Sequence, residues 1–84
     1  MQIITEEYIL DLSNQIPKSV GEQIVFYRKS KNISQAQLAR MIFKDRQHLY
    51  KIETGRVTPR ITTLAIIAAA LDISLSQLFV KIEI

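Results

Sequence analysis

Residues 34–55, SQAQLARMIFKDRQHLYKIETG, decide the fold of this 84-residue chain. The hydroxyl of Ser34 can accept a hydrogen bond from the backbone of a following helix, and Gln37 completes a capping box. The expected buried face of this helix is Leu38, Ala39 and Ile42. Because the side chain of Ala39 is small, a second helix can cross the first one closely.

The second helix of this stretch is expected from about Asp45 to Thr54, after a short turn at Phe43 and Lys44. Asp45 is its predicted cap, and Gly55 follows it, where the end of a helix favours a left-handed residue. Leu49 and Ile52 are its inward positions. The pair of helices therefore leaves one outer face free, which carries Arg46, Gln47, Tyr50 and Lys51.

Two further helices are predicted before this pair. Thr5 is the cap of the first, and its apolar positions recur at helical spacing up to a stop at Pro17: Tyr8, Ile9, Leu12 and Ile16. Ser19 and Glu22 form the capping box of the next helix. Its apolar stripe is Val20, Ile24 and Tyr27.

Two helices and a strand are predicted after the pair. Beyond Pro59, Thr62 or Thr63 caps a helix with Leu64, Ile67, Ala68 and Leu71 as its apolar positions. Ser74 caps a short last helix that carries Leu75, Leu78 and Phe79. The alternation of apolar and charged residues over 80–84 has the period of a strand, so a short terminal strand is expected.

The composition limits the classes of protein that the chain can belong to. It has no cysteine and a single histidine, His48, so a disulfide, a structural metal site and a catalytic constellation are not expected. No glycine-rich phosphate loop appears, so neither an enzyme nor a bound cofactor is predicted. The longest apolar run, Leu64–Leu71, is too short to cross a bilayer, and the lack of cysteine fits a cytoplasmic protein without membrane contact.

The charge of the chain is concentrated in its middle. Residues 18–60 hold ten Lys or Arg against three acids, whereas residues 1–17 hold three acids and no base. A basic middle is typical of a surface that binds a polyanion, and it is also compatible with an ordinary solvated surface. On the free helix face, Arg46 and Lys51 have the chemistry to contact guanine, and Gln47 can pair with adenine.

A longer series of residues matches a known pattern. The matching elements are Arg28, Ser34-Gln35-x-x-Leu38-Ala39, Leu49-x-x-Ile52-Glu53-x-Gly55, Pro59, Leu64, Ile67-Ala68-x-Ala70-Leu71 and Ile73. At these spacings the chain resembles the phage-repressor and Cro type of helix-turn-helix regulator, often called Xre-like, from about Val20 to Phe79. The resemblance implies an all-α fold, a five-helix repressor-like domain, to which this chain adds an N-terminal helix and the short terminal strand.

The resemblance also implies roles for single residues. It places Arg46, Gln47 and Lys51 at positions that read bases, with Tyr50 on the flank. The predicted phosphate contacts are Ser34, Gln35, Lys44, Thr54, Arg56 and Arg60. Gln35 would also brace the second helix of the pair. Arg28 and Glu53 match two residues that form an internal salt bridge in relatives.

Three positions depart from the residues that relatives favour. Phe43 stands where glycine is usual, so the turn is expected either to open or to use Phe43 as an extra hydrophobic anchor. Asn32 stands at another frequent glycine site and tolerates a positive φ. Asp72 stands where glycine or asparagine is common.

The predicted function is sequence-specific binding of double-stranded DNA by a repressor or controller of transcription. A homodimer on a palindromic operator is expected, because one recognition helix makes few base contacts. The alternative is an interaction module or antitoxin that uses the same fold to dock a protein partner. The expected division is an extension at 1–18, the domain at 19–79 and a tail at 80–84. The extension could pack as a lid on Phe26 and Tyr27 or form a dimer interface.

Overall fold

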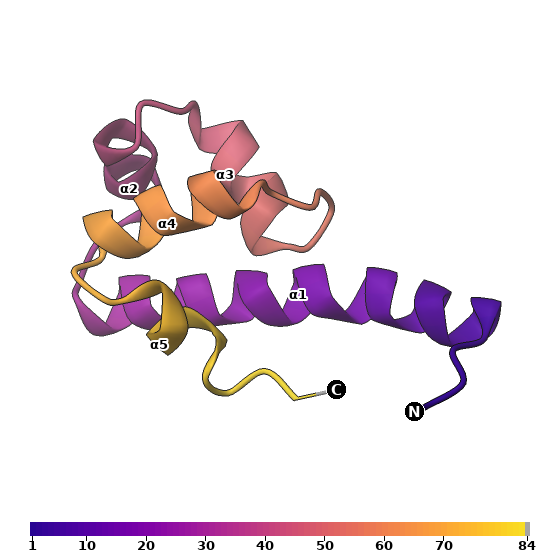
Figure 1. Cartoon of the computed structure of the whole chain (residues 1–84). Coiled ribbons are helices and arrows are strands. Elements are labelled where there is room, and N and C mark those ends of the chain that lie inside the picture. Colours follow the sequence, from indigo (N-terminus) through magenta and orange to yellow (C-terminus); the bar gives the residue numbers. More distant parts are fainter. Residues whose placement is uncertain (84) are drawn as a thin grey trace.

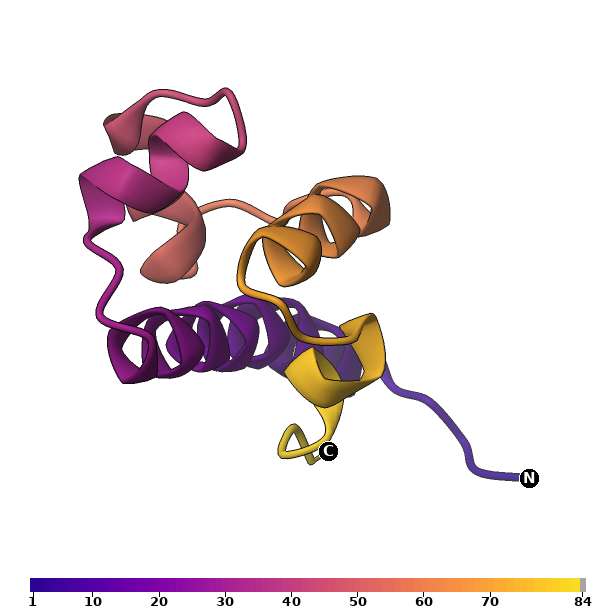
Figure 2. The same cartoon turned by 90° about the vertical axis from the view of Figure 1, so that its left-hand side faces the viewer.

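The structure is a computed structural model that describes residues 1–83. Its longest element is the first helix, which packs against the helices that follow. The helices are α1 (Glu6–Ser30), α2 (Gln35–Met41), α3 (Arg46–Glu53), α4 (Ile61–Ala70) and α5 (Leu75–Phe79). Figure 1 shows α2, α3 and α4 above α1, with α5 beside it. In the view along α1, α2 and α3 lie on one side and α4 and α5 on the other (Figure 2). The all-α prediction is confirmed.

One core joins the five helices. Each contributes apolar side chains, and the largest of those that are less than 2% exposed are Ile24, Leu38, Leu49, Ile52, Ile67, Leu71 and Leu78. Together with the other buried apolar residues they recur at intervals of three or four, as in Val20 and Ile24 of α1 and Leu49 and Ile52 of α3, which is the spacing of one face of an amphipathic helix. Most of the buried positions expected from the sequence are therefore confirmed.

The expected stop at Pro17 is wrong. Thr5 caps α1 as predicted, accepting a hydrogen bond from the backbone of Tyr8 (3.1 Å), but the helix continues through Pro17 to Ser30. Ser19, the expected cap of a separate helix, lies inside α1. Proline removes one helical hydrogen bond, and burial of the Pro17 side chain against the core offsets part of that cost.

The continuity of α1 also excludes the lid. Residues 6–16 lie in the same helix as Phe26 and Tyr27, so they cannot fold back over these two rings. The expected domain boundary at residue 18 likewise falls inside a helix. The C-terminal tail approaches Phe26 instead, where the ammonium group of Lys81 lies 5.4 Å from the centre of a ring that stays 53% exposed.

Two expectations at the C-terminal side need correction. Neither Thr62 nor Thr63 caps α4; its N-cap is Arg60, and no side chain makes a capping hydrogen bond there. No strand occurs in residues 1–83, and Ile84 lies outside the described residues. Instead, Val80 ends α5, and Ile82 packs against the core. The capping boxes or caps predicted at Ser34, Asp45 and Ser74 are confirmed.

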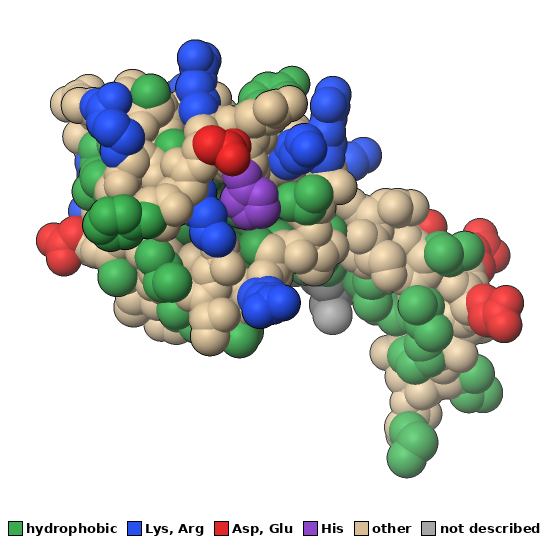
Figure 3. Space-filling view, turned by 90° about the horizontal axis from the view of Figure 1, so that it is seen from above, with side chains coloured by type: hydrophobic (Ala, Val, Ile, Leu, Met, Phe, Trp, Pro, Cys, Tyr) green, Lys and Arg blue, Asp and Glu red, His purple; other side chains and the backbone are tan. Residues whose placement is uncertain are grey.

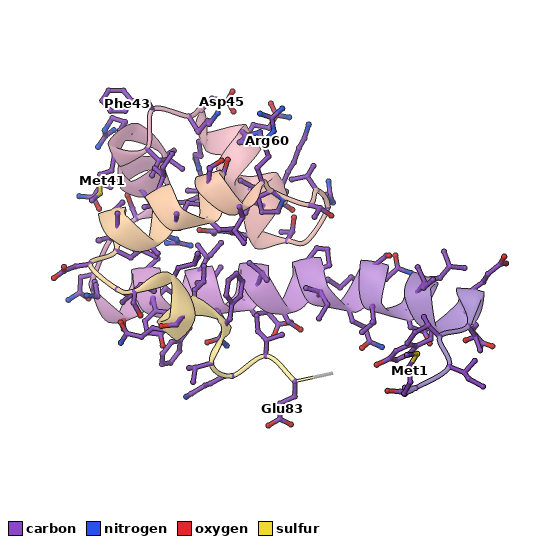
Figure 4. All side chains as sticks on the ribbon, in the orientation of Figure 1. Met1, Met41, Phe43, Asp45, Arg60 and Glu83 are labelled. Atoms are coloured by element: carbon purple, nitrogen blue, oxygen red, sulfur yellow. The ribbon has the colours of Figure 1, made fainter. Side chains whose placement is uncertain are left out.

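Four helices end with the same left-handed turn. The residues with positive φ are Asn32, Phe43, Gly55 and Asp72, with φ values of 57°, 57°, 73° and 57°. In each turn the backbone N–H of the next residue donates to a carbonyl five residues back, as from Lys44 to Ala39 (3.0 Å). The turn at Phe43 is therefore not opened. Its ring is 94% exposed, so Phe43 is not an anchor in the core either (Figure 4).

Two glycines allow α1 to contact the end of α3. A Cβ atom on Gly21 would collide with the carbonyl oxygen of Glu53 and lie 2.7 Å from its carbonyl carbon. A Cβ atom on Gly55 would lie 2.7 Å from the Cα atom of Lys18. The backbones of the two helices are thus packed too closely for any side chain at these positions.

The turn at Phe43 predicts that Phe43→Gly stabilises the protein. An L-residue in the left-handed region costs about 1–2 kcal/mol, and the exposed ring returns little packing energy. We expect the free energy of unfolding to rise by about 1 kcal/mol, measured by urea denaturation. Asn32→Gly is the control, and its smaller gain follows from the tolerance of asparagine for positive φ. A loss of stability in Phe43→Gly would contradict the prediction.

Candidate nucleic-acid interface

The α2–α3 pair presents one polar face of α3 to solvent. Leu49 and Ile52 on the opposite face are buried in the core, which fixes the rotation of the helix about its axis. As a result, the four residues predicted to read bases are all exposed: Arg46, Gln47, Tyr50 and Lys51. The cap at Asp45 accepts a hydrogen bond of 2.7 Å from the backbone of His48 and sets the first turn of α3.

A buried ion pair fastens α3 to α1. The Nε atom of Arg28 donates to one carboxylate oxygen of Glu53 at 2.8 Å, and Nη2 donates to the other at 2.9 Å. The two side chains are 10% and 3% exposed. Nη1 donates to the carbonyl of Ile33 at 3.0 Å, so Arg28 also holds the segment that leads into α2. The salt bridge implied by the resemblance is present, and its role is structural.

Gln35 links the buried ion pair to the exposed face. Its amide nitrogen donates to Glu53 at 2.9 Å, and its amide oxygen accepts from the Nε atom of Arg46 at 3.2 Å. The carboxylate of Glu53 can only accept hydrogen bonds, which forces the amide oxygen of Gln35 to face the other way. Arg46 is thereby held at the start of α3 by a series of hydrogen bonds that begins in the core.

Three of the predicted base-reading residues meet at a shallow surface hollow. Arg46, Gln47 and Tyr50 line it together with Gln35. The guanidinium carbon of Arg56, which follows α3, lies 5.5 Å from the centre of the Tyr50 ring. Lys51 is exposed on the same helix but does not line the hollow. The hollow offers hydrogen-bond donors and acceptors with an aromatic ring at one side.

A second groove brings two of the predicted phosphate contacts together. Its volume is about 290 Å³, and Lys44 and Arg60 line it with His48 and Thr63. The sequence excluded His48 as a metal ligand or catalytic residue, and the structure places it in this groove. The groove lies between the start of α3 and the start of α4, beside the polar face described above.

The other predicted phosphate contacts lie at helix ends. Ser34 caps α2, where its hydroxyl oxygen accepts from the backbone of Gln37 at 3.0 Å. The hydroxyl of Thr54 donates to the carbonyl of Tyr50 at 2.8 Å. Both residues are exposed, as is Arg56. The view from above shows Lys and Arg side chains spread over the body of the molecule and acidic side chains at the N-terminal end of α1 (Figure 3).

The described residues hold no group of three metal-ligating side chains within reach of one ion. None of the helices described is both long enough and apolar enough to cross a bilayer.

Comparison with known proteins gives consistent matches. A sequence model of the helix-turn-helix family (HTH_3) matches residues 26–78. The immunity repressor protein of Bacillus phage phi105 is 37% identical over 60 residues, which are 71% of this chain and 42% of the repressor. The chain therefore spans less than half of the length of this repressor.

Two solved structures share the fold at similar identity. The restriction-modification controller protein C.AhdI from Aeromonas hydrophila superimposes with a TM-score of 0.73 and 28% identity, over 76% of this chain and 97% of that protein. An HTH_3 family transcriptional regulator from Vibrio cholerae superimposes with a TM-score of 0.77 and 28% identity, over 83% of this chain and 39% of that protein.

The buried ion pair predicts a large loss of stability in Glu53→Ala. Removal of the carboxylate leaves the Arg28 charge buried without its partner, which costs about 3–5 kcal/mol of unfolding free energy. Thermal and urea denaturation measure the loss. Glu22→Ala, at an exposed position of α1, is the matched control and is expected to change stability by less than about 1 kcal/mol. Equal melting temperatures for the two variants would refute a structural role for the pair.

Proposed function

The chain belongs to the helix-turn-helix family of DNA-binding transcriptional regulators, and we propose that it binds a palindromic operator as a homodimer and represses or controls transcription there. The observation that carries the proposal is the hydrogen-bonded series from Arg28 through Glu53 and Gln35 to Arg46, because it holds a base-reading arginine in place before DNA arrives. A regulator of this kind acts in the cytoplasm.

The residues divide into two groups by the contacts that we propose for them. Those on the free face of α3 read bases in the major groove: Arg46, Gln47, Tyr50 and Lys51. Those around it bind phosphates and set the register of the protein on the duplex: Ser34, Gln35, Lys44, Thr54, Arg56 and Arg60. The similarity to an immunity repressor and to a restriction-modification controller protein supports a role in gene control.

Selection of bound sequences from a random pool of DNA duplexes tests the proposal. A dimer is expected to select two inverted half-sites with centres about 34 Å apart, one turn of DNA. Binding should also weaken by about 10³-fold between 50 and 200 mM salt, if three cationic residues of each protomer contact phosphates. If no sequence is enriched from the pool, and the chain instead binds a protein partner with an affinity that does not change with salt, the result supports the interaction module or antitoxin.

The two groups of contacts predict different effects of two arginine variants. Arg46→Ala should weaken binding to the selected operator by about 1–3 kcal/mol, and it should leave binding to a random duplex nearly unchanged. Arg56→Ala should weaken both complexes by similar factors, because a phosphate contact carries no sequence information. Fluorescence anisotropy titrations on the two duplexes measure all four affinities. Equal losses of affinity on both duplexes for Arg46→Ala would instead show that Arg46 contacts the phosphate backbone of the DNA.

A further inference from the structure

The N-terminal end of α1 extends beyond the rest of the molecule. We call residues 6–13 the arm. In Figure 1 the arm runs past the loop between α3 and α4, and the molecule measures 42 × 23 × 20 Å along its principal axes. Ile9 and Leu10 on the arm are 52% and 64% exposed. A short helical end with exposed apolar residues gains little stability from its own backbone, so a packing partner is expected.

The apolar side of the arm continues the core face of α1. Ile9 lies eleven residues, about three turns, before buried Val20, and Leu10 lies fourteen residues before buried Ile24. The residues of α1 that pack inside the domain and the exposed ones of the arm therefore share one side of a straight helix. That side packs against the rest of the chain from about Ile16 and the buried Pro17 onward, and Ile9 and Leu10 lie before this point.

An apolar groove lies where the arm leaves the domain. Its volume is about 340 Å³. The apolar side chains that line it are Leu12, which belongs to the base of the arm, and Ile16, Pro17, Val20, Pro59, Leu64 and Phe79. Because α1 is one continuous helix, Ile9 and Leu10 cannot bend back into the groove of their own chain. The exposed apolar side chains of the arm, Ile9 and Leu10, therefore do not reach the apolar groove that begins at Leu12 of the same molecule.

The charges around these two features have opposite signs. The arm carries Glu6, Glu7 and Asp11, all exposed, and no basic residue. Beside the groove stands one exposed cation, Lys18, which adjoins Pro17 of the groove wall, whereas Arg60, next to Pro59, lines the second groove described above. Figure 3 shows acidic and apolar side chains on the arm and Lys and Arg side chains on the body of the molecule. An arm from another molecule would meet a favourable charge at the rim.

We propose that the arm of one protomer lies in the groove of a second copy, whose arm occupies the groove of the first. The N-terminal ends of the two α1 helices then run antiparallel across a two-fold axis. Because the interface is symmetric, the arm and the groove of each chain are covered at the same time. The inference rests on the homodimer of the proposed function and names its interface. The negative charge of the arm favours a surface that carries Lys18 over an acidic one.

Sedimentation of the full chain without DNA tests the interface. Leu10→Glu places a charge on the side of the arm that the proposed dimer buries, and it should raise the dissociation constant of the dimer by roughly tenfold or more. The matched control is Ile66→Glu, a similarly exposed residue of α4 outside the groove, which should self-associate like the unmodified chain. Equal dissociation constants for both variants, or an unmodified chain that stays monomeric at high micromolar concentration, would overturn the proposal.

A cross-linking experiment tests the position of the arm directly. The natural chain has no cysteine, so single cysteines mark chosen sites without background. A mixture of Leu10→Cys chains and Thr58→Cys chains, treated with a short bismaleimide, should give the mixed dimer, because Thr58 lines the groove. The pair Ile66→Cys and Thr58→Cys should give several-fold less. Equal yields from the two mixtures would place the interface elsewhere.

DNA binding separates failure of the interface from failure of the proposed function. Leu10→Glu should bind a duplex with one half-site as the unmodified chain does, and should lose affinity only for two half-sites. Loss of binding to both duplexes would contradict the proposal that the arm acts through dimerisation alone. If the unmodified chain binds no duplex, the proposed function fails, while the sedimentation and cross-linking results still decide the interface.

Discussion

The buried pair of Arg28 and Glu53 is the interaction on which the rest of the structure depends. A carboxylate that is 3% exposed is stable in the interior only when its oxygens are paired, and here they accept two hydrogen bonds from Arg28 and one from Gln35. The three side chains come from three helices: Arg28 from α1, Gln35 from α2 and Glu53 from α3. The pair therefore fixes the relative positions of three helices, because any shift of one would leave a buried charge without its partner.

The same pair determines how the polar face of α3 is presented. The amide of Gln35 cannot rotate without placing its oxygen against the carboxylate of Glu53, so its oxygen stays directed at Arg46. Arg46 is an exposed side chain, and a long exposed side chain ordinarily samples many rotamers. Restriction of Arg46 before binding lowers the entropy lost on contact with a base. Under the proposed function, the core residue Glu53 would thus contribute to base recognition although it does not itself contact DNA.

Local rules in the sequence predicted most of the fold. The caps at Ser34, Asp45 and Ser74 depend on contacts within four residues, and the core positions depend on helical spacing, so both could be read directly. Pro17 was misread, because its local effect opposes a helix while its burial in the core favours one. The apolar stripe offered a usable signal: it keeps the same phase on both sides of Pro17, as one continuous helix requires. The sequence did not indicate the N-cap of α4, because Arg60 is not a residue type that caps a helix and its side chain makes no capping hydrogen bond.

The site was predicted as a set of residues but not as a network. The resemblance implied the pair of Arg28 and Glu53, whereas the contacts of Gln35 with both Glu53 and Arg46 depend on how α2 crosses α3. That crossing depends in turn on α1, whose Gly21 lies against the backbone of Glu53 without room for a Cβ atom. The direction of α1 relative to α3 is therefore set by backbone contact and by the buried ion pair together. Since the arm is the straight continuation of α1, the same contacts that orient Arg46 also orient the proposed dimer interface, and so they constrain the distance between two recognition helices.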